Sequence, residues 1–187
     1  MSEKEKMLAG KWYDANFDQE LLSLRSKSNA LCFEFNQTHP NDNKTKEKLL
    51  QRLLPNCHPN VTILSPFYAD YGVNCFIKEG TFINHNAYLM DGGLITIGTN
   101  CFIGPNSGFY TANHPLDIER RNSGLEQASP IVIGDNVWIG AGVTILPGVT
   151  IGEGSVIGAG SIVNKDVPVN VLALGNPCRV IRSIDNN

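Results

Sequence analysis

The chain has 187 residues, and its 15 Lys and Arg against 18 Asp and Glu give a formal net charge of −3. This balance argues against a nucleic-acid partner, which favours a basic surface stripe. No apolar run approaches the roughly 20 residues of a membrane span, and the N-terminus lacks the apolar core of a signal peptide. We therefore expect a cytoplasmic protein with no membrane contact.

The first 57 residues predict a helical subdomain. The segment is charged, and its apolar residues recur at helical spacing, most clearly in the run 46–54, where four leucines share one face. Pro40 and Pro55 mark the ends of such runs. We expect this subdomain, residues 1–57, to cap a second one that spans residues 58–184.

A six-residue repeat governs the second part. Branched residues open successive hexads, and the fifth place of each hexad is small or β-branched. The opening residues are Ile133, Ile139, Ile145, Ile151, Ile157 and Val163. A period of six fits neither a helix nor a simple strand, but it fits flat sides separated by corners. Three such sides close a triangular coil, so the sequence predicts a parallel β-helix whose stacked coils bury these residues.

The repeat extends upstream from Ile77, with two interruptions. Between Leu89 and Ile97 the step is eight residues, which inserts two residues near Asp91. Between Phe109 and Ile133 the period disappears, and a polar segment at about 110–130 replaces it. Insertions in repeat proteins are commonly loops on the binding face, so we expect a functional site near these breaks.

His114 lies where the repeat gives way to this loop, and Pro115 follows it. A histidine titrates near neutrality and is suited to remove a proton from a hydroxyl. The alternative is a surface or packing histidine, and position alone does not separate the two.

Cations gather at the end of the repeat. Between Ile131 and Cys178 the single basic residue is Lys165, and Arg179 and Arg182 follow closely. Such a group can hold phosphates, although solvated charges on a terminal segment are an equal alternative. Outward-facing side chains occupy the sixth place of a hexad, so we expect Trp138 there to form either an interface or a stacking surface.

Polar residues crowd the early coils at 84–86 and at Asp91, next to a Gly-Gly pair. They indicate either a ligand site or a simple turn. Five cysteines, an odd number without CxxC spacing, predict structural thiols, and the four histidines lack zinc spacing. We therefore expect no metal.

Several segments together resemble the maltose/galactoside O-acetyltransferase group of the hexapeptide-repeat acyltransferases. They cover nearly the whole chain: the opening 7–13 (MLAGKWY), 35–40 (FNQTHP), 111–115 (TANHP), 158–166 (GAGSIVNKD) and 175–182 (GNPCRVIR). The resemblance implies a left-handed β-helix, mainly β in class, with an N-terminal helical subdomain and an extended loop. It also implies a homotrimer whose active sites lie between subunits.

By this resemblance the protein is an acetyl-CoA-dependent O-acetyltransferase that acts on a sugar hydroxyl. His114 is the implied general base, and Glu126 in the loop is a candidate to orient its ring. The candidate acceptor-binding residues are Asn84, Asp70 and Asp91. The positions matching the CoA site are Trp138, Ala141, Ala159, Asn164, Lys165, Arg179 and Arg182.

Departures from the family leave the acceptor open. Asp70 stands where the lactose-type enzyme carries Ser, Gly92 where it carries Asp, Asn164 replaces a common Thr and Ala141 a common Ser. Serine or an amino sugar is an alternative acceptor for the same chemistry. A catalytically inactive β-helix that serves as a binding module is a further alternative. A carbonic-anhydrase-like metal site is disfavoured, because it needs a histidine triad.

Overall fold

A computed structural model describes residues 1–185 of the chain. Its N-terminal part contains helices whose first turns are capped by polar side chains: Ser2, Asp18 and Asp42 each accept a hydrogen bond from a backbone N–H. The elements are α1 (Glu3–Leu8), β1 (Tyr13–Asp14), α2 (Gln19–Gln37) and α3 (Asn43–Leu53). Among residues 1–185, no helix is long and apolar enough to cross a membrane.

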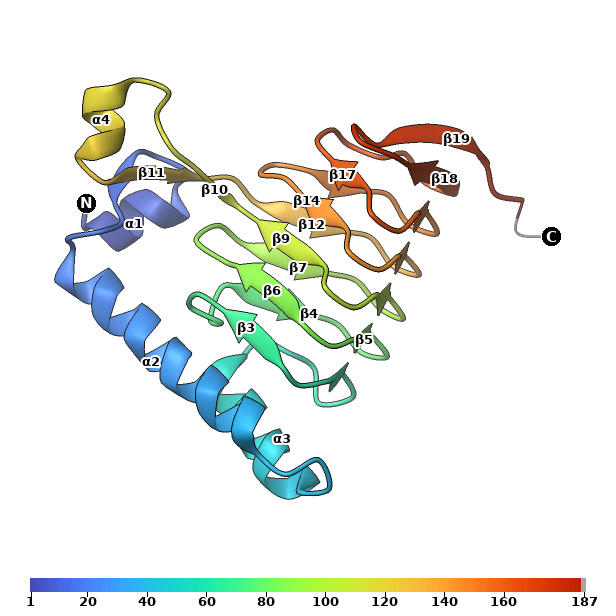
Figure 1. Ribbon diagram of the computed structural model, residues 1–187, viewed down its shortest axis with the longest axis horizontal. Coiled ribbons are helices and arrows are strands. Elements are labelled where there is room, and N and C mark those ends of the chain that lie inside the picture. Colours follow the sequence, from blue (N-terminus) through green and yellow to red (C-terminus); the bar gives the residue numbers. More distant parts are fainter. Residues whose placement is uncertain (186–187) are drawn as a thin grey trace.

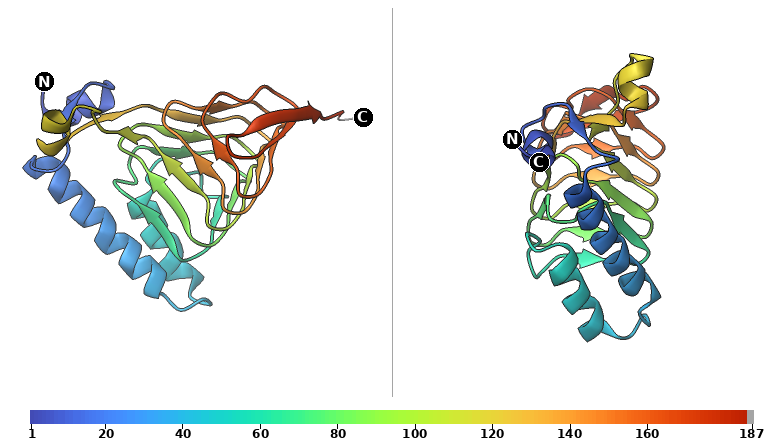
Figure 2. Two further views of the ribbon diagram at one scale, coloured as in Figure 1. Left: turned by 45° about the horizontal axis from the view of Figure 1, so that its top comes forward. Right: turned by 90° about the vertical axis from the view of Figure 1, so that its left-hand side faces the viewer.

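The rest of the chain winds into a β-helix with three parallel faces (Figure 1). Seen obliquely, its coils have a triangular outline (Figure 2). Within residues 1–185 the faces are a four-stranded, a seven-stranded and a five-stranded sheet, all parallel except for the last pair, β18–β19.

The strands of each face follow a fixed order. The four-stranded sheet is β15 (Thr150–Ile151), β12 (Ile131–Ile133), β7 (Ile95–Ile97) and β4 (Cys75–Ile77). The seven-stranded sheet is β19 (Arg179–Ser183), β18 (Val171–Leu174), β16 (Val156–Ile157), β13 (Trp138–Ile139), β8 (Phe102–Ile103), β5 (Phe82–Ile83) and β2 (Thr62–Ile63). The five-stranded sheet is β17 (Ile162–Val163), β14 (Thr144–Ile145), β9 (Gly108–Tyr110), β6 (Ala87–Met90) and β3 (Phe67–Ala69).

The hexad pattern sets which side chains fill this β-helix. The first-place residues from Ile133 to Val163 and the fifth-place residues from Val137 to Val167 are all buried, with Ile139 and Ile145 fully enclosed. Trp138 faces outward and is 57% exposed. Equivalent isoleucines stack in register from coil to coil, as Ile103, Ile139 and Ile157 do. The predicted parallel β-helix and its inward rows are confirmed.

Glycine serves two different purposes in the hexad. At the second place, a Cβ on Gly140 would lie 2.6 Å from the backbone nitrogen of Ala159, so glycine there allows close stacking of coils. At the fourth place, Gly142 has a φ of +65°, and this is where the chain turns the corner. The turn therefore falls two residues later than the glycine that directly follows the first-place residue.

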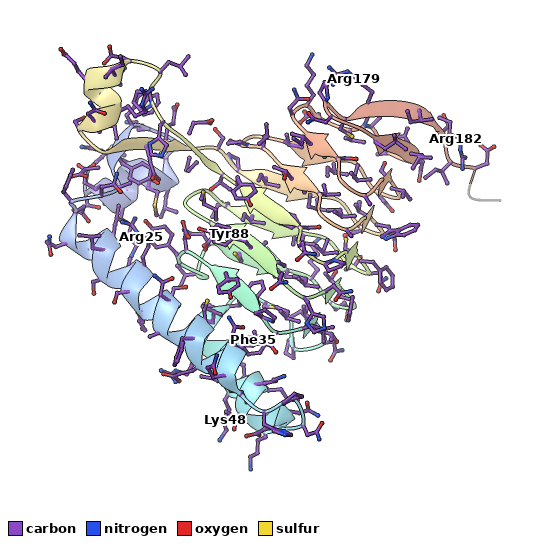
Figure 3. All side chains as sticks on the ribbon, viewed as in Figure 1. Arg25, Phe35, Lys48, Tyr88, Arg179 and Arg182 are labelled. Atoms are coloured by element: carbon purple, nitrogen blue, oxygen red, sulfur yellow. The ribbon has the colours of Figure 1, made fainter. Side chains whose placement is uncertain are left out.

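Helices α2 and α3 cover the first coil. Phe35 of α2 is fully buried between this helix and the β-helix (Figure 3), and Leu49 and Leu53 of α3 join the same core. The side chain of Asn36 donates to the carbonyl of Phe67 at 3.0 Å and accepts from its N–H at 2.8 Å. It thereby satisfies backbone groups at the edge strand β3, which would otherwise be unpaired.

The interruption after β9 folds into a hairpin-like extension. It contains β10 (Ala112–Asn113), α4 (Ile118–Asn122) and β11 (Leu125–Ala128). Strand β11 pairs antiparallel with β10 on one side and with β1 on the other. The predicted loop is therefore an ordered arm that is tied to the N-terminal segment.

Candidate functional site

His114 follows β10 at the base of this arm. Its Nδ1 lies 3.0 Å from the carbonyl oxygen of Leu125 on β11. A carbonyl can only accept a hydrogen bond, so in the neutral ring Nδ1 carries the proton and Nε2 keeps the lone pair. The side chain is 48% exposed, so Nε2 can be reached from outside. This is the tautomer that a general base requires.

Glu126 lies beside the free nitrogen of His114. Its Oε1 is 3.7 Å from His114 Nε2, and its Oε2 accepts a hydrogen bond of 2.8 Å from the Tyr13 hydroxyl. The sequence makes Glu126 a candidate to orient the ring, and in the structure the ring hydrogen bond is made by the Leu125 carbonyl. Tyr13 was not among the predicted site residues, because a contact between residues 113 positions apart leaves no local pattern.

Asp70 and two tyrosines form a polar and aromatic surface on the outer face of the five-stranded sheet. The Asp70 carboxylate accepts a hydrogen bond from the Tyr88 hydroxyl, and the Tyr88 ring meets the Tyr110 ring edge-on at 5.9 Å. Burial raises the pKa of Asp70, and the negative charges of Asp91 and Glu126 raise it further. The hydrogen bond from Tyr88 opposes this rise. Asp70 therefore lies within electrostatic range of Glu126, the carboxylate beside His114.

Asp91 has a different environment from the one its predicted acceptor-binding role needs. Its side chain is fully buried, and its carboxylate accepts from the N–H groups of Tyr71 at 2.8 Å and Asn74 at 3.2 Å. Burial raises its pKa, and these backbone hydrogen bonds oppose that rise. The eight-residue step is thus a turn fastened by Asp91, whose oxygens point into the chain rather than toward an acceptor.

Replacing Asp91 with alanine should leave the Tyr71 and Asn74 N–H groups buried without a partner. Each such loss costs about 1–3 kcal/mol. We expect the free energy of unfolding, measured by denaturant titration, to fall by about 2–6 kcal/mol. Glu153→Ala, at an exposed hexad position, serves as the control and should change it by less than about 0.5 kcal/mol. An Asp91→Ala protein as stable as the parent would contradict this role.

The outer face of the seven-stranded sheet carries a row of apolar side chains. In register from coil to coil they are Phe82, Phe102, Trp138, Val156 and Leu172. They line a hollow of about 580 Å³ together with three of the predicted ligand-binding residues, Asn84, Ala141 and Ala159. The structure therefore places Asn84, Trp138, Ala141 and Ala159 along one groove.

The predicted cations lie at the C-terminal end of this groove. Arg182 on β19 stands opposite Leu172 in the register, so the apolar row ends in a guanidinium. Lys165 and Arg179 line a smaller hollow of about 120 Å³ nearby, and Asn164 precedes Lys165 in an exposed corner. Arg179 and Arg182 both project from the C-terminal hairpin, far from the helices (Figure 3).

His114 and Asn84 lie at opposite ends of the strands of the five-stranded sheet. Asn84 is in the corner that precedes β6, whereas His114 follows the last residue of β10 beyond β9. The extended segment between these two ends, residues 108–113, spans roughly 15–20 Å at about 3.3 Å per residue. Within one chain the predicted site is therefore divided into two parts that lie apart. Across residues 1–185, no three His, Cys, Asp or Glu side chains converge in the manner of a metal site.

Comparison with known proteins agrees with this fold. Residues 6–58 match the maltose acetyltransferase hexapeptide capping motif, residues 130–165 the bacterial transferase hexapeptide repeats, and residues 94–111 the hexapeptide repeat of succinyl-transferase. A putative acetyltransferase of Staphylococcus aureus (strain MRSA252) is 57% identical over 186 residues, which cover 100% of this chain and 94% of that protein.

Two solved structures extend the comparison. A maltose O-acetyltransferase from Clostridium difficile 630 is 46% identical and superposes with a TM-score of 0.96, over 100% of this chain and 99% of that one. A galactoside acetyltransferase in complex with coenzyme A is 41% identical with a TM-score of 0.92, over 100% and 92% of the two chains. The predicted fold class is confirmed. The chain belongs to the hexapeptide-repeat acetyltransferases of the maltose and galactoside O-acetyltransferase type, and it is an acetyl-CoA-dependent acyltransferase.

Proposed function

We propose that the enzyme transfers the acetyl group of acetyl-CoA to a hydroxyl of a sugar, with His114 as the general base. The observation that carries this proposal is the hydrogen bond from His114 Nδ1 to the Leu125 carbonyl, which in the neutral ring leaves the lone pair on the accessible Nε2. His114 Nε2 removes the hydroxyl proton as the sugar oxygen attacks the thioester carbonyl carbon. The same nitrogen then returns the proton to the departing CoA thiolate.

No covalent acyl-enzyme is needed in this scheme. Holding both substrates in contact turns a bimolecular step into an intramolecular one, and this supplies a large part of the rate. The negative oxygen of the tetrahedral intermediate requires hydrogen-bond donors, which backbone N–H groups in the corners can provide. Glu126 adds a negative charge 3.7 Å from the nitrogen that becomes positive during the reaction.

A sugar suits the surface next to His114. Tyr88 and Tyr110 present apolar ring area, and the Asp70 carboxylate can accept hydrogen bonds from hydroxyl groups. The maltose and galactoside named for the similar structures point to the same class of acceptor. An amino sugar is the second candidate, because the Asp70 carboxylate could also pair with an ammonium group. Asp91, whose carboxylate is occupied, has no part in either version.

The complete site is proposed to form between subunits of a homotrimer. One chain holds His114 and the acceptor surface, and a neighbour supplies Asn84 and the groove in which CoA lies. Two further features support this arrangement: the groove face carries half-exposed Phe102 and Trp138, and the arm ends in Leu116 and Ile118, which are 94% and 64% exposed. Apolar side chains grouped on a surface indicate an interface.

An acceptor panel tests the proposed activity. The purified enzyme is given acetyl-CoA with maltose, glucose, a galactoside, glucosamine or serine, and free thiol release and product mass are measured. We expect the highest kcat/KM for a neutral sugar and a mass increase of one O-acetyl group. A preference for glucosamine over glucose would favour the amino sugar, and a preference for serine would contradict a sugar acceptor.

Lys165 and Arg179 are expected to hold the phosphates of CoA. Replacing either with alanine removes a charge-assisted hydrogen bond and should raise the Kd for acetyl-CoA about tenfold. At 100 times the parent Kd, acetyl-CoA stabilises the parent by about 2.7 kcal/mol and such a variant by about 1.4 kcal/mol, which calorimetry can resolve. Lys44→Ala, at the exposed start of α3, is the matched control. Equal stabilisation of all these proteins would contradict the assignment.

A further inference from the structure

Tyr13 reaches the candidate active site from the N-terminal segment. Strand β1 pairs with β11, and this pairing sets Tyr13 directly opposite Glu126. The Tyr13 side chain is 1% exposed, although its hydroxyl touches a carboxylate that is itself partly accessible. Burial, together with the Glu126 charge, raises the pKa of Tyr13 far above its usual value. The phenol therefore keeps its proton and acts as a donor to Glu126.

The space for this phenol is provided by Gly92. A Cβ added at Gly92 would lie 3.1 Å from the Tyr13 hydroxyl oxygen, with no strain in the backbone itself because its φ is not positive. A larger residue at position 92 would therefore crowd the Tyr13 hydroxyl. Glycine at this position and tyrosine at position 13 together define where the Glu126 carboxylate is held.

The geometry of Glu126 has two consequences for His114. At 3.7 Å its Oε1 is too far from Nε2 for a hydrogen bond, so it does not occupy the lone pair that must accept the hydroxyl proton. It is close enough for its charge to stabilise the imidazolium that forms once the proton is transferred. Both consequences require that the carboxylate neither moves onto Nε2 nor turns away.

We propose that Tyr13 is a positioning residue for the acetyl transfer: its hydrogen bond to Glu126 Oε2 holds the other carboxylate oxygen beside His114 Nε2 without closing on it. This inference rests on the proposed role of His114 as the base. Without the Tyr13 hydroxyl, the Glu126 side chain is free to rotate and pair directly with His114. That pair favours the protonated ring and removes the base from part of the working pH range.

Other charged groups lie around Tyr13, Glu126 and His114, and the variants described below leave these groups unchanged. Arg25 of α2 donates to the Tyr71 hydroxyl, and both lie within electrostatic range of Tyr13. Asp70 lies within the same range of Glu126. Arg121 of α4 donates to the carbonyls of Pro115 and Leu116, next to His114. Their contributions are common to the parent and the variants, so a difference between these proteins reports on Tyr13 and Glu126.

The test is the pH dependence of kcat/KM in Tyr13→Phe, Glu126→Gln and the double variant. Tyr13→Phe should lower kcat about tenfold through the misplaced carboxylate, with an unchanged KM for acetyl-CoA. It should also move the acid limb of the profile up by about one pH unit, whereas Glu126→Gln should move it down. In the double variant the phenylalanine should have no further effect, because the charge that Tyr13 positions is absent. Tyr68→Phe, on an exposed ring, is the matched control.

The outcomes separate this inference from the proposed function. A folded Tyr13→Phe enzyme whose acid limb coincides with that of the parent would overturn the positioning role, as would additive effects of the two substitutions. If Tyr13→Phe loses stability, its acid limb can still be read at reduced temperature, and the coupling with Glu126→Gln decides the question. An active His114→Ala enzyme would instead overturn the proposed base.

Discussion

Replacing His114 with alanine is expected to lower kcat at least about a hundredfold, the usual contribution of a positioned general base. The side chain is half exposed and is held by a hydrogen bond to the Leu125 carbonyl, so the fold should survive the change. The affinity for acetyl-CoA should be retained, because the residues proposed to contact CoA, among them Trp138, Lys165 and Arg179, are unchanged. The measurement is steady-state thiol release with a saturating sugar, together with the melting temperature.

His39→Ala is the matched control for this substitution. His39 is exposed after α2, and its Nδ1 accepts a single hydrogen bond from the Asn41 N–H. Its removal should leave kcat within a factor of about two, since surface changes away from a site have small effects. A His114→Ala enzyme with near-parent turnover would show that another group removes the hydroxyl proton.

The largest effect on stability is expected from Ile139→Ala. Ile139 is fully buried between Ile103 and Ile157, which occupy the same place in the coils on either side. Deleting its side chain costs transfer free energy and also leaves a cavity, which together amount to about 2–5 kcal/mol. Backbone hydrogen bonds fix the spacing of the coils, so the stack cannot close around the missing atoms. Denaturant titration measures the loss.

Ile181→Ala provides the comparison, because Ile181 lies on β19 and is 55% exposed. We expect it to change the free energy of unfolding by less than about 0.5 kcal/mol. Equal losses in the two variants would mean that burial within the coils is not what stabilises the repeat.

The fold could be predicted because each coil repeats the same local rule. Each hexad from Ile133 to Val163 places a branched residue inward, and the pattern is read from many hexads, so one atypical position does not hide it. The corner position was the exception. The glycine after Ile139 allows the close approach of two coils, and the corner lies at Gly142 instead. A period identifies the unit of the repeat but not the place in it where the backbone turns.

The candidate site could be predicted only in part, because contacts between distant segments build it. The loop and His114 were visible as a break in the period. The carbonyl that orients His114 belongs to Leu125, and a backbone group carries no sequence signal. Tyr13 and Glu126 meet through the pairing of β1 with β11, and no local sequence pattern predicts this pairing. Asp91 was expected at the acceptor because of its neighbours, but its carboxylate satisfies buried N–H groups of a turn.

The separation of His114 from Asn84 within one chain gives the most direct test of the account. His114→Ala and Asn84→Ala chains are each purified, mixed in equal amounts, unfolded and refolded together, and assayed for acetyl transfer to the preferred sugar. If each site combines His114 of one subunit with Asn84 of a neighbour, random trimers contain intact sites at about a quarter of the positions. The mixture should then regain about a quarter of the parent activity, far above either variant alone. Activity no higher than the mean of the two variants would contradict a site that is completed by the neighbouring subunit.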